Sequence, residues 1–172
     1  MSKLRKATDT REALALFREH SREELQSDLD FTAEVFGKAV NGFMNENLRE
    51  LRKVLTAVEE KKIHLKQVKR VGTLGVTQLD HDIAVEKGLY YYQGNDFASE
   101  IIFSIRRLAE PLKDHIDNNF SPLSPVQKDD FGKVSGQIIS FLRNCATMIR
   151  KNDYIGFEEL IAESITLMNQ LT

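Results

Sequence analysis

The sequence predicts an all-α protein, an up-and-down antiparallel helical bundle that forms a single domain over residues 1–172. Apolar residues recur at spacings of three and four through most of the chain, and no useful length shows the alternation of a half-buried strand. Pro and Gly are few, at 3 and 9 residues, and the expected connections are short. Short connections favour antiparallel neighbours, so four or five helices packed side by side are the simplest arrangement.

The first helix is expected over residues 11–43. Its apolar positions recur at threes and fours with one gap of seven, which is typical of a helix with one buried face. These positions are Leu25, Leu29, Phe36, Val40 and Phe43. Ser21 followed by Glu24 has the spacing of a capping box, which predicts that the helix restarts after a bend near His20.

The second helix is expected over residues 46–69, because asparagines within residues 45–47 can cap its first turn. Its buried stripe comprises Leu48, Leu51, Leu55, Val58 and Leu65. Gly72 and Gly75 then predict a break, since each glycine costs a helix about 1 kcal/mol relative to alanine.

The third helix is expected to be the longest, over residues 77–119. One face carries Leu79, Ile83, Tyr90, Phe97, Ile101, Leu108 and Leu112. Pro111 predicts a kink, because proline lacks a backbone donor and clashes with the preceding turn. Asn118 and Asn119 suit the end of this helix.

A connection over residues 121–125 follows, with Ser124 as N-cap and Pro125 at the first position of the fourth helix. That helix is expected to run to about Lys151, with Val134, Ile138, Phe141, Cys145 and Met148 facing inward. A fifth is expected over residues 154–171, with Phe157, Leu160, Ile161, Leu167 and Met168 facing the core.

Charge and composition exclude several classes of protein. The net charge is -2, with 24 basic and 26 acidic side chains interleaved, so no nucleic-acid partner is expected. The basic run Lys61, Lys62, Lys66, Lys69 and Arg70 is interpreted as a solvated helix face. No apolar run approaches the roughly 20 residues that span a bilayer. The lone Cys145 lies among apolar residues and is expected to be an inert, buried thiol.

No catalytic signature for nucleotide, zinc-hydrolase or serine-hydrolase chemistry is present, so no enzyme is expected. The histidines are scattered, and none has a second His or Cys at a metal-ligand offset. A di-iron oxidase or hydrolase in a helical bundle typically uses Glu-x-x-His pairs. This sequence contains no Glu followed three residues later by His.

Two acidic pairs at helical spacing are the strongest chemical feature. Asp82 and Glu86, and Asp96 and Glu100, are each four residues apart, and the two pairs are offset by fourteen. All four carboxylates therefore share about a third of one helix circumference, where they could hold a hard cation through oxygen ligands. The alternative is a solvated helix edge on which these acids pair with Lys87, Arg106 or Arg107.

One stretch resembles a known family. It comprises Tyr90, Tyr91, Tyr92 and Gln93, then Asp96 and Glu100, the run 104–108, and His115, Ile116, Asp117, Asn118, Asn119 and Phe120 before Pro122, Leu123 and Ser124. It resembles the cytoplasmic C-terminal domain of bacterial inorganic phosphate transporters. That domain is similar to PhoU, the accessory protein of phosphate uptake and signalling. The resemblance is specific over residues 86–124 and diffuse elsewhere.

The resemblance implies a PhoU-like helical bundle with an acidic metal site. PhoU proteins bind metal clusters through E-x-x-x-D or D-x-x-x-D signatures, and the matching positions here are Asp82, Glu86, Asp96 and Glu100, in the reverse order D-x-x-x-E. The implied cofactor is a divalent or ferric metal ion. Tyr90, Tyr91, Tyr92, Gln93, His115, Asp117, Asn118 and Asn119 form the implied interaction or structural signature.

The resemblance also implies a function, that of a non-catalytic regulatory domain that modulates phosphate uptake. Such a domain docks on the membrane-embedded phosphate permease, or on a second copy as a homodimer, at the inner face of the cell membrane. It belongs to a larger membrane protein whose last span precedes residue 1. The alternative is a free-standing PhoU-like accessory protein that binds metal and a signalling partner.

Overall fold

The computed structural model describes the backbone of residues 2–76 and 81–170, and the side chains of residues 15, 18–70 and 93–170. These residues form helices and connections, and no strand occurs among them. The helices are α1 (Ser2–Met44), α2 (Leu48–Val76), α3 (His81–Asp117), α4 (Pro125–Lys151) and α5 (Phe157–Gln170). The predicted all-α antiparallel bundle is therefore confirmed.

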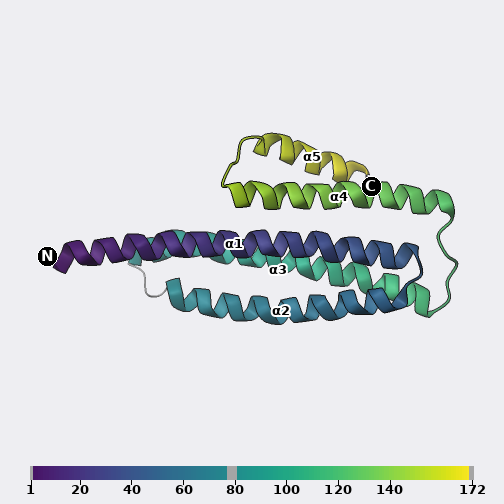
Figure 1. Cartoon of the computed structure of the whole chain (residues 1–172), viewed down its shortest axis with the longest axis horizontal. Coiled ribbons are helices and arrows are strands. Elements are labelled where there is room, and N and C mark those ends of the chain that lie inside the picture. The colour runs from purple at the N-terminus through teal and green to yellow at the C-terminus, as the bar shows by residue number, and fades with distance from the viewer. Residues whose placement is uncertain (1, 77–80, 171–172) are drawn as a thin grey trace.

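The helices form a three-helix unit with a helical pair on one side (Figure 1). Each of α1, α2 and α3 contacts the other two, whereas α4 contacts only α1 and α5 among the described helices. The last helix, α5, folds back along α4 and has no other helical neighbour in the described part of the chain. Within the described residues, the position of α5 therefore depends on its contact with α4 alone.

The main core lies within the three-helix unit, where the predicted stripes of α1 and α2 are largely confirmed. Its buried members are Val35, Phe36, Ala39, Val40, Leu51, Val54, Val58, Leu65, Ile102, Ile105 and Ala109. Helix α4 packs against this unit through half-buried side chains, including Ile138 and Ile139.

The third helix is rotated from its predicted register. Its buried positions are Ala98, Ile102, Ile105 and Ala109, whereas the predicted Phe97 is 67% exposed. The prediction favoured large side chains, but alanines at an interface let neighbouring helices approach closely. The inner face of α3 therefore consists of two alanines and two isoleucines, and the predicted Leu108 and Leu112 pack half-buried against the same core. The side chains of the predicted Leu79, Ile83 and Tyr90 lie outside the described residues.

Two expected helix boundaries are absent, the restart near His20 and the break at Gly72 and Gly75, whereas the kink expected at Pro111 stays a prediction. Helix α1 runs without a break from Ser2 through His20 to Met44. Helix α2 continues through the two glycines to Val76, and α3 continues past Pro111 to Asp117. Propagating a helix adds one hydrogen bond per residue, whereas a restart needs a new nucleus. Two glycines at about 1 kcal/mol each do not outweigh that difference.

The start of α4 is as predicted. Ser124 is the N-cap, Pro125 is the first helical residue, and Ser124 and Gln127 form a reciprocal capping box. The helix ends at Asn152, which adopts a left-handed φ of 50° and donates its backbone N–H to Ile149 and Met148 carbonyls. Local sequence therefore defines both ends of α4.

The predicted inner face of α5 is only partly correct. Leu167 is buried and Leu160 is half-buried, as expected, but Phe157, Ile161 and Met168 are exposed. The physical reason is that α5 has one neighbour among the described helices, and that neighbour covers only one side of it. No described helix is both long and apolar enough to cross a membrane.

Candidate functional site

Two of the four acids predicted to bind metal lie in a groove between α2 and α3. This groove has a volume of about 430 Å³ and is lined in part by Lys62, Lys66, Lys69, Asp96 and Glu100. Asp96 contacts Lys69 across the groove, with Oδ1 2.6 Å from Nζ. The groove therefore mixes cationic and anionic side chains.

Glu100 is also paired. Its Oε2 lies 3.1 Å from Nη2 of Arg107, one of the partners predicted for a solvated helix edge. A metal ion at Asp96 and Glu100 would compete with the cations that both carboxylates already hold. No group of three or more His, Cys, Asp or Glu side chains suited to metal occurs among the described residues.

The side chains of the other two acids of the predicted metal site lie outside the described residues. Asp82 and Glu86 belong to the helical backbone of α3, but their side chains are not among those described, and the same holds for Tyr90, Tyr91 and Tyr92. The four-carboxylate metal site therefore stays a prediction. Gln93, the next residue of the predicted signature, is exposed.

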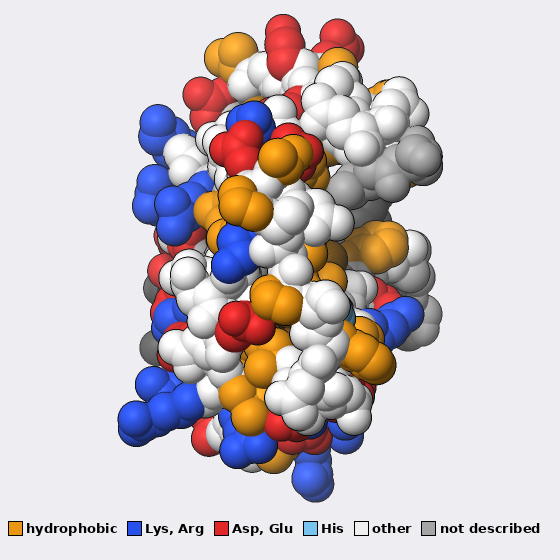
Figure 2. All heavy atoms as spheres, turned by 90° about the vertical axis from the view of Figure 1, so that its right-hand side faces the viewer, with side chains coloured by type: hydrophobic (Ala, Val, Ile, Leu, Met, Phe, Trp, Pro, Cys, Tyr) orange, Lys and Arg blue, Asp and Glu red, His pale blue; other side chains and the backbone are white. Residues whose placement is uncertain are grey.

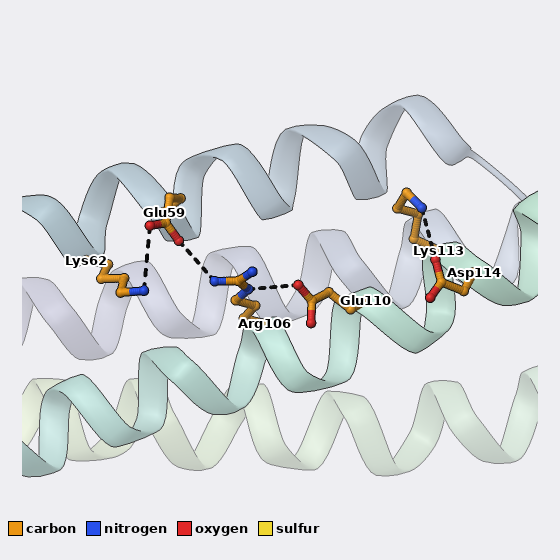
Figure 3. A network of polar contacts seen from close by, with 6 residues as sticks. All are labelled: Glu59, Lys62, Arg106, Glu110, Lys113 and Asp114. Carbon is orange, nitrogen blue, oxygen red and sulfur yellow. Dashed lines mark hydrogen bonds and ion pairs between the residues drawn. The ribbon is translucent and has the colours of Figure 1, made fainter.

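Ion pairs continue along the α2–α3 interface beyond the groove (Figure 3). Arg106 of α3 reaches Glu59 of α2 at 3.3 Å and Glu110 of its own helix at 2.8 Å. Lys62 of α2 contacts the same Glu59 at 3.6 Å. These groups are solvent-accessible, so water screens them, and each pair contributes little to the stability of the fold.

The second half of the predicted signature terminates α3. Asn119 adopts a left-handed φ of 53°. The N–H of Asn119 donates to the carbonyl of Ile116, and the N–H of Phe120 donates to that of His115. This pair of hydrogen bonds is a Schellman motif, which satisfies carbonyls at the end of a helix. Asn118 adds a bond from Nδ2 to the Asp114 carbonyl.

His115 is a packing residue at this helix end. Its ring lies edge-on to Phe43 of α1, with centroids 5.2 Å apart, and 5.4 Å from the ring of Phe120. Nε2 of His115 lies 2.9 Å from the backbone oxygen of Ser121, a hydrogen-bond distance. The imidazole therefore ties the α3–α4 connection to α1.

Asp117 completes the signature and bridges two helices. Its carboxylate contacts Lys113 at 2.7 Å and Arg52 of α2 at 3.5 Å. The hydrogen bond from Lys113, with the positive charge of Arg52, holds the pKa of Asp117 below its ordinary value. The signature residues His115, Asp117, Asn118 and Asn119 therefore serve to end α3 and to set the path into α4.

An ion pair that sequence analysis missed is buried between α1 and α2. Asp28 is 2% exposed, and its Oδ1 lies 2.6 Å from Nζ of Lys61. This oxygen has no other hydrogen-bond donor in the described part of the chain. The prediction of a solvated face is therefore wrong for Lys61. Asp28 lies between Leu25 and Leu29 in the apolar stripe, which is the signal that could have revealed it.

Further titratable groups flank this buried pair. Glu24 of α1 lies 3.6 Å from Nε2 of His64 on α2. Burial raises the pKa of Asp28 above its ordinary 3.8, and the charge of Glu24 adds to the rise, whereas Lys61 opposes it. Lys61 also lies 5.7 Å from the ring centre of Phe31. The cluster joins α1 to α2, and its central pair of Asp28 and Lys61 is shielded from solvent.

Cys145 is half-buried on α4. Burial raises the pKa of its thiol, and the negative charge of Glu163 on α5 acts in the same direction. A thiol that resists ionisation is a poor nucleophile.

Among the described residues, α5 carries more exposed large apolar side chains than any other helix. We define the α5 stripe as Phe157, Ile161, Ile165 and Met168, whose exposed fractions range from 45% to 66%. Tyr154 and Ile155, in the connection just before α5, are exposed as well. A signal for this surface was present in the sequence, because apolar residues occupy too much of the circumference of α5 to be covered by one neighbour.

Other surfaces of the molecule are more mixed. Figure 2 shows the end of the bundle at the right of Figure 1, where hydrophobic side chains alternate with charged ones of both signs. Phe120 and Val126, from the α3–α4 region, are among the exposed hydrophobic residues. Single exposed apolar residues are common on proteins, whereas an ordered apolar stripe indicates an interaction site.

Comparison with protein-family models, with curated proteins and with solved structures finds no match for the chain.

Proposed function

We propose that the chain is a non-catalytic regulatory domain that modulates inorganic phosphate uptake by docking against the membrane-embedded part of a phosphate transporter. The exposed α5 stripe carries this proposal. It presents large apolar side chains along one side of a helix whose single helical neighbour in the described part of the chain is α4. Such a surface suits a partner protein, because burying it removes apolar area from water.

The link to phosphate transport rests on the family resemblance. It lies over residues 86–124, which include the end of α3 and the connection to α4. In the structure the His115–Asn119 segment ends α3, and Ser124 starts α4. The segment that resembles phosphate-transporter domains therefore positions the helical pair that bears the docking surface.

The ion pairs in the α2–α3 groove favour this function over that of a metal-binding accessory protein. Asp96 and Glu100 already contact Lys69 and Arg107. A docking domain needs no metal ion at Asp96 and Glu100. The alternative function, a free-standing PhoU-like accessory protein, requires metal binding there.

Uptake of radiolabelled phosphate tests the proposal. Cells of the source organism carry either the natural chain or the Ile161→Asp/Ile165→Asp variant in the chromosomal copy. We expect the initial uptake rate to change by about fivefold or more, the lower range of allosteric couplings. The matched control is Ile63→Asp, since Ile63 on α2 has the same 53% exposed fraction as Ile165.

The controls separate regulation from loss of protein. Immunoblots must show equal amounts of the chain in all strains, and the Ile63→Asp strain must take up phosphate at the natural rate. An unchanged rate in the double variant, at equal protein level, refutes a role of the α5 stripe in uptake.

A further inference from the structure

We propose that the α5 stripe is the seam of a homodimer, in which α5 of one copy packs antiparallel to α5 of a second copy. The dimer follows from the stripe itself and does not need the proposed function. It bears on that function, because a copy whose stripe is covered by a second copy cannot use the same side chains to dock on the transporter. Dimerisation and docking therefore compete for one surface.

The stripe lies at the outer edge of the molecule. Figure 1 shows α5 alongside α4, on the side of α4 that is away from α1, α2 and α3. Among the described helices, α4 is the single neighbour of α5. The covered side of α5 carries Leu160 and Leu167, and the stripe lies about 100° around the helix from it. A second copy can therefore reach the stripe without displacing α4.

The exposed apolar area approaches that of a standard interface. The four stripe residues, with Tyr154 and Ile155 just before α5, have exposed fractions from 45% to 89%. At roughly 150–200 Å² for a fully exposed side chain of this size, the six present roughly 600 Å². A stable interface hides about 800 Å² on each partner, part of it in a polar rim. The stripe and its extension therefore supply most of the area that a dimer needs.

The stripe also matches its own two-fold image. Its residues are spaced by four, four and three, so its midpoint lies between Ile161 and Ile165. A two-fold axis at this midpoint pairs α5 with an antiparallel copy. It places Phe157 opposite Met168 of the second copy, and Ile161 opposite Ile165 of the second copy. Methionine adapts to irregular surfaces and makes favourable contacts with aromatic rings, so the two ends of the seam suit each other.

The charges of α5 are compatible with an antiparallel seam. The helix contains Glu158, Glu159 and Glu163 and no Lys or Arg. At about 100° per residue, Glu159 and Glu163 lie more than about 150° from the middle of the stripe. Glu158 borders the stripe near one end, so its two copies lie about 14 Å apart along an antiparallel pair, beyond the screening length of about 8 Å. A parallel pair would bring these two glutamates together.

Two other occupants fit the stripe less well. Helices that lie in a membrane surface are rich in Lys and Arg on their polar face, whereas α5 itself contains neither. A partner that is recognised through its charge finds no ion-pair partner in the stripe, whose four members are all uncharged. A second copy matches the stripe in size and in spacing.

Sedimentation equilibrium of the full chain tests the dimer. We expect the natural chain to be dimeric at about 100 µM and to dissociate on dilution, with a dissociation constant in the micromolar range or below. Ile161→Asp/Ile165→Asp should raise that constant by about tenfold or more, the loss typical of interface hot spots. The matched control is Ile63→Asp on α2, which has the exposed fraction of Ile165 and should keep the natural constant.

Disulfide cross-linking tests the register. In a Cys145→Ser background, Phe157→Cys and Met168→Cys chains are prepared separately and oxidised alone or mixed. The mixture should give a cross-linked dimer, because the two positions are opposite each other. Each variant alone should give little, since copies of one position lie about 16 Å apart along the seam and a disulfide needs Cα atoms within about 7 Å. Circular dichroism must show natural helix content in every variant.

Several results overturn the inference. One is a natural chain that stays monomeric at about 100 µM, and another is a dimer that Ile161→Asp/Ile165→Asp leaves intact. Cross-linking of each cysteine variant with itself, as a parallel pair gives, is a third. Stripe-dependent binding of a monomeric chain to vesicles of phosphatidylglycerol and phosphatidylcholine assigns the stripe to a membrane and also overturns it.

The proposed function can fail independently of the dimer. Dimerisation of the natural chain, with unchanged phosphate uptake in cells that carry the monomeric double variant, supports the seam and refutes the proposed function. Changed uptake in those cells, with a natural chain that is monomeric in solution, does the reverse.

Discussion

The buried pair of Asp28 and Lys61 predicts a large and pH-dependent loss of stability when the lysine is removed. Side chains of both residues are close to fully buried, with exposed fractions of 3% and 11%. Removing one member of a buried pair costs about 3–5 kcal/mol, because the other charge stays buried without a partner. Since Lys61 retains some access to water, Lys61→Met should lower the free energy of unfolding by about 3 kcal/mol near pH 7.

The pH dependence follows from the pKa of Asp28. Burial already raises this pKa above 3.8, and Lys61 opposes the rise, so Lys61→Met should raise it further. A carboxyl whose pKa is higher in the folded state takes up a proton on folding between the two pKa values. The stability of the variant should therefore fall as pH increases through that window. Its deficit relative to the natural chain should be greatest near neutral pH and smallest in acid.

Urea unfolding followed by circular dichroism at several pH values measures this effect. The control is Lys53→Met, because the Lys53 side chain is 62% exposed and lies 3.6 Å from Glu50. We expect that control to change stability by no more than about 0.5 kcal/mol. Asp28→Asn/Lys61→Met should recover part of the loss, since neither buried charge remains. A deficit in Lys61→Met that is below about 1 kcal/mol, or equal at all pH values, refutes the reasoning.

Three smaller predictions concern helix ends and glycines, and unfolding measurements check each of them. Gly136→Ala should stabilise the chain by about 0.5–1 kcal/mol, since an added Cβ meets nothing within 4 Å, whereas Gly42→Ala should lose this gain because its Cβ comes 3.3 Å from Leu51. Asn119→Ala should lower the free energy of unfolding by about 1 kcal/mol, because position 119 has a left-handed φ of 53°, which a side chain with a Cβ disfavours. Asn119→Gly should leave the free energy of unfolding unchanged, because glycine adopts this φ without strain. Ser124→Ala should cost about 1 kcal/mol through loss of the capping box; a neutral result would show that the cap is dispensable.

Sequence analysis succeeded where structure depends on neighbouring residues. Ser124 and Pro125 define the start of α4, and the left-handed Asn119 ends α3. Both features follow from local backbone chemistry, which a sequence displays directly. The stripes of α1 and α2 were also predictable, because each has one dominant apolar face.

Prediction failed where the burial of a side chain depends on which helices are neighbours in space. The exposure of Phe97 follows from which face of α3 packs inward, the face that carries Ala98, Ile102, Ile105 and Ala109. The burial of Lys61 follows from the position of Asp28 on another helix. Periodicity indicates that a helix has an apolar face, but not whether a neighbour exists to cover it. For that reason Phe157, Ile161 and Met168 of α5 were assigned to an inner face, although only Leu160 and Leu167 of that predicted face are covered.

The order of contacts determines how a partner on α5 could influence the rest of the chain. Among the described helices α5 contacts only α4, and α4 otherwise contacts only α1. A change at the α5 stripe therefore reaches the α2–α3 groove either through the α3–α4 connection, which His115 ties to α1, or through the α4–α1 interface. That interface is tight near Gly37, where a Cβ would come 3.2 Å from Cδ1 of Ile139. Because packed helices resist continuous deformation, docking at α5 should shift α4 and α1 together rather than bend α4 alone.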